Sequence, residues 1–125
     1  MPSQKGNLPD APPLPGELLK IRDFCARKAG FEHTESFTQA LVTRYPVGAG
    51  IGPHCDAQNL GENVLTLALG TDATMVFQSE DKQERKILFP RRSLLVIAGS
   101  LRWKFKHEIK PVKQERYSIT FRDPA

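Results

Sequence analysis

The stretch YPVGAGIGPHCD, residues 45–56, is the segment from which the fold of this chain is predicted. Its alternating glycines and its two prolines indicate a bend that leads the backbone into a short extended segment. In such a segment residues i and i+2 point to the same face, so His54 and Asp56 would present an imidazole and a carboxylate to one point. Alone, this pair is weak evidence of a site, because a chain with three histidines has an acidic residue at such a spacing about one time in three.

Segments that flank this bend predict a mostly β fold. Residues 64–69 alternate, with three leucines on one face, and residues 93–98 (SLLVIA) are nearly all apolar, as in a buried strand. Further strands are expected at residues 40–45, 74–78, 87–89, 101–109 and 116–122. Short strands at this spacing predict two antiparallel sheets in a sandwich or barrel of the jelly-roll kind.

The N-terminal part of the chain predicts one covering α-helix. Residues 1–14 are rich in proline and are expected to be irregular, which leaves residues 15–125 as the single folded domain. Pro15 suits the first turn of a helix that should run to Ala29, and Gly30 should end it. The apolar stripe expected to pack on the sheet consists of Leu18, Ile21, Cys25 and Ala29.

Composition limits the class of protein. A chain of 125 residues, 39% of them hydrophobic, is long enough for one domain with one modest core. It contains no apolar run near the roughly 20 residues that cross a bilayer, and its first residues lack the apolar segment of a secretory signal. Two cysteines suit a reducing compartment. We therefore expect a cytoplasmic monomer (or a nuclear one in a eukaryote) without a membrane partner.

Positive charge is concentrated towards the C-terminus. The 41 residues from Arg85 onward carry eleven Lys and Arg against three Asp and Glu, which gives them a net charge of +8 and leaves −4 on the first 84 residues. A basic surface of this kind is typical of proteins that bind nucleic acid. The alternative is a set of strand edges kept basic to prevent aggregation. Charge alone does not choose between them.

A second histidine lies on the expected strand 101–109. Alternation would place Trp103, Phe105 and His107 on one face of that strand, and Arg102, Lys104 and Lys106 on the other. A buried face that ends in histidine holds either a core imidazole or a metal ligand beside a pocket. The third histidine, His33, lies among acidic and polar residues and is interpreted as a surface residue.

The last expected strand carries an unusual polar face. In residues 116–122 one face packs a core with Tyr117, Ile119 and Phe121. The other face consists of Arg116, Ser118, Thr120 and Arg122. Two guanidinium groups on one strand face repel each other and are costly to bury without anions, whereas a bound dicarboxylate would compensate both. The alternative is an exposed edge strand with two solvated arginines.

The ordered motifs of the chain resemble those of the AlkB family of Fe(II)/2-oxoglutarate dioxygenases. His54, Asp56 and His107 together would form the 2-His-1-carboxylate triad that holds a non-haem Fe(II). The resemblance covers roughly residues 14–123. Its motifs, in chain order, are Thr43-Arg44-Tyr45, His54-x-Asp56, PRRSLLV at positions 90–96, Arg102 followed after four residues by His107, and Arg116 followed after five by Arg122.

This resemblance implies a double-stranded β-helix, which is a distorted jelly roll, and the cosubstrates 2-oxoglutarate and O2. The residues that it implies as iron ligands are His54, Asp56 and His107. It also implies that Arg116 grips the distal carboxylate of 2-oxoglutarate, that Tyr45 hydrogen-bonds to it, and that Arg122 acts at the iron-bound end. Other side chains expected to line that site are Thr43, Ser118 and Thr120.

The chain departs from the family pattern in three respects. Thr43 and Ser118 stand where the family often has Asn, which alters hydrogen bonds to the cosubstrate. Gln58 stands where bacterial repair enzymes have an acidic residue that touches the base. About 40 residues precede Thr43, whereas family members usually carry a longer N-terminal lid over the flipped nucleotide. We therefore expect either a trimmed core or a substrate that is held differently.

The family resemblance implies oxidative demethylation of N-alkylated bases in DNA or RNA, on a single strand or a flipped base. The residues considered for contact with the base are Gln58, Trp103 and Phe105. One alternative is a dioxygenase that hydroxylates a protein side chain or a small molecule. Another is a non-catalytic module that binds nucleic acid through Arg and Lys. A metal-binding cupin without 2-oxoglutarate is the third, and the paired Arg116 and Arg122 argue against it.

Overall fold

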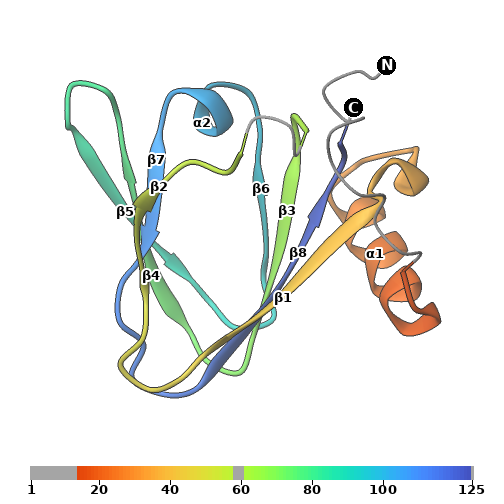
Figure 1. Cartoon of the computed structure of the whole chain (residues 1–125), viewed down its shortest axis with the longest axis horizontal. Coiled ribbons are helices and arrows are strands. Elements are labelled where there is room, and N and C mark those ends of the chain that lie inside the picture. Colours follow the sequence, from red (N-terminus) through yellow and green to blue (C-terminus); the bar gives the residue numbers. More distant parts are fainter. Residues whose placement is uncertain (1–13, 58–60, 125) are drawn as a thin grey trace.

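The computed structural model describes residues 14–57 and 61–124, and within these ranges the chain forms two facing β-sheets with a helix on one side (Figure 1). The first sheet has the strand order β1-β8-β3-β6. Its strands are β1 (Gln39–Tyr45), β8 (Arg116–Arg122), β3 (Val64–Leu69) and β6 (Leu94–Ile97). The second sheet has the order β2-β7-β4-β5. Its strands are β2 (Ile51–His54), β7 (Lys106–Ile109), β4 (Ala73–Gln78) and β5 (Glu84–Phe89).

All strand pairs within the two sheets are antiparallel, as the predicted jelly roll requires. Successive strands mostly cross from one sheet to the other, so residues distant in the sequence become neighbours. The most important case is β8, which is last in the chain and lies between β1 and β3 in the first sheet. The mostly β fold with an N-terminal covering helix is therefore confirmed.

Helix α1 (Gly16–Lys28) covers the outer face of the first sheet (Figure 1). It agrees with the helix expected from Pro15 to Ala29, and Pro15 is its N-cap. An outer core forms where the helix meets the sheet. Its buried members are Cys25, Ala26, Phe37, Leu65, Ile119 and Phe121. The predicted irregular segment, residues 1–14, lies outside the described residues except for Leu14.

An inner core fills the space between the two sheets. It includes Val64 and Ala68 from the first sheet, and Met75, Phe77 and Ile109 from the second. The larger of these side chains, Val64, Met75, Phe77 and Ile109, each stabilise the fold by about 1.5–3 kcal/mol when fully buried. In the described part of the chain, no helix is long and apolar enough to cross a membrane.

The prediction of one strand over residues 101–109 was wrong. The segment begins as a short helix, α2 (Gly99–Trp103), and only β7 (Lys106–Ile109) is extended. The physical reason lies in Arg102, whose guanidinium is buried and hydrogen-bonded to the backbone carbonyls of Asp56, Ala57 and Gly61. These contacts take the segment out of the sheet, so Trp103 does not share a strand face with His107.

Candidate metal centre and its pocket

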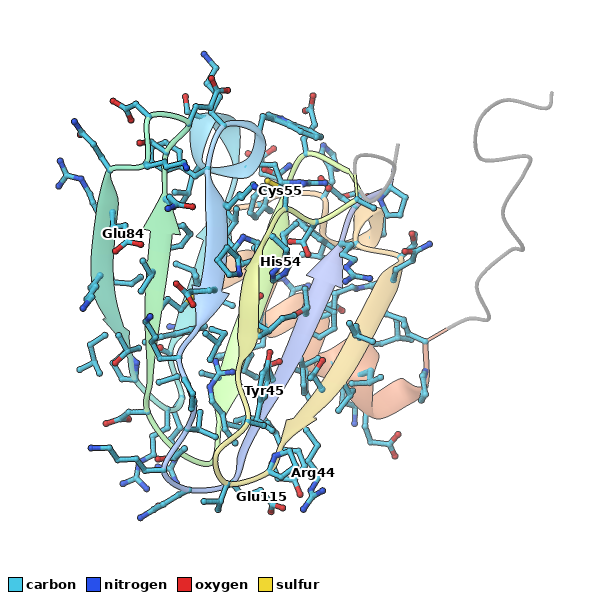
Figure 2. The ribbon with its side chains drawn as sticks, turned by 60° about the vertical axis from the view of Figure 1, so that its left-hand side comes forward. Arg44, Tyr45, His54, Cys55, Glu84 and Glu115 are labelled. Carbon is cyan, nitrogen blue, oxygen red and sulfur yellow. The ribbon has the colours of Figure 1, made fainter. Side chains whose placement is uncertain are left out.

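Three side chains converge at one end of the space between the sheets. The potential ligand atoms of His54, Asp56 and His107 all lie within 4.8 Å of one another. His54 is the last residue of β2 and is paired with His107 of β7, and their ring centroids are 4.4 Å apart. The Nε2 atom of His107 lies 3.8 Å from Oδ2 of Asp56. Figure 2 shows His54 on β2, next to Cys55. Two imidazoles and one carboxylate are a donor set that suits Fe(II).

The surroundings of both histidines favour metal binding. Nδ1 of His54 lies 2.8 Å from the carbonyl oxygen of Gly52. Because a carbonyl oxygen only accepts, this contact assigns the donor role to Nδ1 and leaves Nε2 as the ring nitrogen that is available to a metal. Burial and the neighbouring His54 lower the pKa of His107, against an opposing effect of Asp56. A neutral imidazole is the form that binds a metal.

Asp56 reaches this cluster for a different reason from the one that the sequence suggested. β2 ends at His54, so strand alternation does not place Asp56. Arg102 does, because its guanidinium donates to the carbonyl oxygens of Asp56 (2.8 Å), Ala57 (2.7 Å) and Gly61 (3.0 Å). The arginine is only 2% exposed. Strand alternation had predicted that Arg102 lies on a cationic face with Lys104 and Lys106. The one feature of the sequence that pointed to a role at this site was its spacing of five residues from His107.

A pocket of about 120 Å³ adjoins the three side chains. One wall is the polar face of β8, where alternation was predicted correctly. The predicted side chains that line the pocket are Thr43, Tyr45, Arg116, Ser118, Thr120 and Arg122. Tyr45 is opposite Arg116 and Thr43 is opposite Ser118 in the register of β1 with β8. On the other side of β8, Thr66 of β3 is opposite Thr120, and their hydroxyls lie 3.3 Å apart. Thr66 also lines the pocket and was not among the predicted residues.

The two arginines of this wall lack anionic partners among the described residues. Arg116 is 1% exposed, and its Nε and one terminal nitrogen have no hydrogen-bond partner there. Its guanidinium carbon lies 5.1 Å from the ring centroids of both Tyr45 and Phe89. Nε of Arg122 also lacks a partner. Burial lowers the pKa of both arginines, and the nearby Asp56 opposes this effect at Arg122. A buried donor without an acceptor is costly, so this wall fits an anionic ligand.

The remaining predicted residues lie elsewhere. Trp103 is 43% exposed on α2, and Phe105 packs against the inner core; neither lines the pocket. Gln58 lies outside the described residues. The side chain of His33 is 81% exposed, so the interpretation of His33 as a surface residue is confirmed.

The fold and this cluster define a class of protein. The profile of the 2OG-Fe(II) oxygenase superfamily matches residues 3–122, and the chain therefore belongs to this superfamily. Its enzymes are 2-oxoglutarate-dependent dioxygenases, which use Fe(II), 2-oxoglutarate and O2. The triad of His54, Asp56 and His107 and the unpaired donors of Arg116 fit these cofactors in charge and in donor type.

Within the superfamily the chain is AlkB-like. It is 31% identical over 106 residues to the tRNA (carboxymethyluridine(34)-5-O)-methyltransferase alkbh8 of Xenopus tropicalis, which covers 81% of this chain and 17% of that protein. It is 30% identical over 130 residues to the uncharacterized protein L905 of Acanthamoeba polyphaga mimivirus, covering 91% of this chain and 62% of that protein. The chain thus spans less than two thirds of the length of these relatives.

Solved structures agree on the fold. OsALKBH1 superposes with a TM-score of 0.66 at 19% identity, over 96% of this chain and 70% of that one. A Pseudomonas putida prolyl-4-hydroxylase also gives a TM-score of 0.66, at 18% identity, over 89% of this chain and 70% of that one. At these identities the likeness concerns the fold alone.

Proposed function

We propose that His54, Asp56 and His107 hold the Fe(II) and that 2-oxoglutarate lies between the iron and Arg116. The observation that carries this proposal is the pair of unpartnered donors on Arg116, in the same pocket as the triad. Arg116 would bind the distal carboxylate through a charge-assisted, two-point contact. When bound, iron and 2-oxoglutarate together reduce O2 and supply the oxidant that hydroxylates a substrate C–H bond, with succinate and CO2 as coproducts.

The residues of the pocket would each contribute to this reaction. Tyr45 lies beside Arg116 and is positioned to hydrogen-bond to the same carboxylate. Arg122 lies at the end of the pocket near Asp56, where its positive charge would favour the second carboxylate. Met75, Phe89 and Ile97 form an apolar part of the lining. Such a lining keeps water from the oxidant and strengthens the ionic contacts.

The substrate that we propose is an N-alkylated base of DNA or RNA. Hydroxylation of an N-methyl group gives a hemiaminal, whose C–N bond breaks to release formaldehyde and the unmodified base, so that all atoms are accounted for. Three observations support this class of substrate: the AlkB-like sequence, the relatives that are named as tRNA methyltransferases, and the net charge of +8 on the last 41 residues. The basic charge favours a polyanion over a neutral small molecule.

The first experiment measures succinate formed from 2-oxoglutarate with Fe(II) and no added substrate. Wild type is expected to show this uncoupled turnover, and His54→Ala and Arg116→Ala are expected to lose it. His33→Ala and Arg27→Ala are matched controls, because both remove exposed side chains far from the pocket. No turnover in wild type, with no binding of iron or 2-oxoglutarate, would overturn the catalytic assignment.

The second experiment tests the substrate. Oligonucleotides with N-methylated adenine or cytosine are incubated with the protein, Fe(II) and 2-oxoglutarate, and formaldehyde is measured against succinate. Formaldehyde in equal amount to the additional succinate supports demethylation. Uncoupled succinate formation without formaldehyde from any methylated strand would direct the search to protein or small-molecule substrates.

A further inference from the structure

A second groove, of about 380 Å³, lies outside the two sheets. It is formed by α2, by the start of β7 and by the tip of the β4–β5 hairpin, which Figure 1 shows at the same end of the molecule as α2. The residues that line this groove include Cys55, Glu80, Lys82, Trp103, Lys104 and Lys106. Cys55 separates His54 from Asp56 in the chain, and its thiol donates to the carbonyl oxygen of Phe105 at 3.2 Å. The groove therefore begins directly behind the segment that carries two of the proposed iron ligands.

Trp103 provides a fixed aromatic surface in this groove. The guanidinium carbon of Arg102 lies 4.2 Å from the centroid of its ring, and Arg102 itself is buried and held by three carbonyl oxygens. One face of the indole is therefore covered by a group that cannot move freely. Trp103 as a whole nevertheless remains 43% exposed. A rigid aromatic ring with exposed surface is suited to stacking against a planar base.

The charge of the groove favours an anion. Lys82, Lys104 and Lys106 are exposed, and none of them forms an ion pair within the described residues. Glu80 contributes the one negative charge among the residues that line the groove. Three free ammonium groups around one aromatic ring match a strand in which bases alternate with phosphates. An acidic peptide would satisfy the lysines but would leave the ring without a partner.

We propose that this groove binds the single-stranded nucleic acid that flanks the target base, with one base stacked on Trp103 and phosphates held by Lys82, Lys104 and Lys106. The identity of the ligand rests on the proposed function, whereas the site itself lies outside the pocket of the proposed cofactors. The groove would add affinity for longer strands and would contribute little sequence preference, because stacking and phosphate contacts do not read base edges.

Intrinsic fluorescence provides a direct test, since Trp103 is the only tryptophan of the chain. An unmodified oligothymidylate is titrated into the protein without iron or 2-oxoglutarate. Saturable quenching that weakens with salt is expected. In the Lys104→Gln/Lys106→Gln variant the slope of log affinity against log salt should fall by about 0.7 per lysine removed. The matched control is Lys20→Gln/Lys28→Gln on α1, which removes the same charge from exposed sites elsewhere and should keep the wild-type slope.

A labelled oligothymidylate, followed by anisotropy, tests the aromatic ring. Trp103→Ala should weaken binding by roughly tenfold or more, and Trp103→Phe, which keeps an aromatic surface, should recover part of the loss. Absence of quenching in wild type would overturn the proposal. Equal loss of affinity in both lysine double variants would also overturn it. Equal quenching by a polyglutamate peptide would overturn it as well, and would assign the groove to an acidic protein.

Turnover separates this proposal from the proposed function. With a methylated base, wild type should have a lower KM for an oligonucleotide than for the free nucleoside, and the ratio of the two KM values should approach one in Lys104→Gln/Lys106→Gln. An unchanged ratio in this variant would overturn the groove while the demethylase assignment stands. If no methylated base is turned over, the demethylase assignment fails, and the titration of unmodified strands still decides whether the groove binds nucleic acid.

Discussion

Arg102 is the residue whose replacement tests the architecture of the metal centre most directly. It does not line the pocket of the proposed cofactors, and its three hydrogen bonds hold the loop that carries Asp56. Arg102→Met keeps a long apolar side chain but removes every donor. We expect this variant to bind metal poorly because Asp56 is no longer held beside His54 and His107. Arg102→Lys keeps the charge, yet a single ammonium cannot reach three carbonyl oxygens as a planar fork does, so an intermediate effect is expected.

The hydrogen bonds of Arg102 set the expected loss of stability and of metal affinity in Arg102→Met. Hydrogen bonds to a charged group contribute about 1.5–3 kcal/mol each, which would sum to about 5–9 kcal/mol for three. The carbonyls of Asp56 and Ala57 lie in an incompletely buried loop and regain water, and removal of a buried charge offsets part of the loss. We therefore expect the free energy of unfolding of Arg102→Met to fall by about 2–4 kcal/mol. Groups that orient a metal ligand typically change metal affinity by about 10- to 100-fold, and we expect this range here.

Calorimetric titration with Mn(II), which is less readily oxidised than Fe(II), measures the affinity, and urea unfolding measures the stability. The matched control is Arg44→Met. Arg44 pairs with Glu115 at 2.7 Å, at the end of the molecule away from Cys55 in Figure 2. The control should lose little stability, because the pair is exposed, and should keep the wild-type metal affinity. If Arg102→Met folds and binds Mn(II) as tightly as wild type, the argument that Arg102 positions Asp56 is refuted.

Three further predictions concern other parts of the molecule. Arg116→Met should abolish the binding of 2-oxoglutarate, as measured by titration. The same change should raise the unfolding free energy of the ligand-free protein by about 1 kcal/mol or leave it unchanged, and a marked fall would contradict the unpaired state of this guanidinium. Gly50→Ala should lower the free energy of unfolding, measured in urea, by roughly 1–3 kcal/mol and should weaken Mn(II) binding, because a methyl group at this position overlaps the carbonyl oxygen of Ile109 and displaces β2. Wild-type values in both assays would contradict this steric argument. Iodoacetamide at pH 8 should label exposed Cys55 quickly and Cys25 only after unfolding, since Cys25 is 2% exposed and burial raises the pKa of its thiol. Equal labelling of the two cysteines in the folded protein, measured by mass spectrometry, would show that the outer core is open.

The sequence predicted the parts of the fold that depend on local periodicity. The helix over α1, the strands β1, β3 and β8, and the division of β8 into a polar and an apolar face all follow from alternation or helical spacing within one segment. It did not predict α2 or the burial of Arg102. The carbonyl partners of Arg102 are 41 to 46 residues away in the chain, so no local pattern could reveal that this arginine is satisfied inside the protein.

The same distinction explains why His54 and Asp56 lie together, as expected, although strand alternation does not account for the position of Asp56. His54 ends β2 and faces His107 because of strand register, whereas Asp56 depends on a contact from α2 that forms only when the chain has folded. Arg116 and Arg122 need no such contact for their position, since β8 is paired on both sides and alternation alone points them into the pocket. Neither arginine forms an ion pair with another described residue. A ligand that binds the folded state at one hundred times its Kd adds about 2.7 kcal/mol of stability. The unpaired arginines therefore make the folded state sensitive to an anion, and 2-oxoglutarate should raise the unfolding temperature of wild type but not of Arg116→Met.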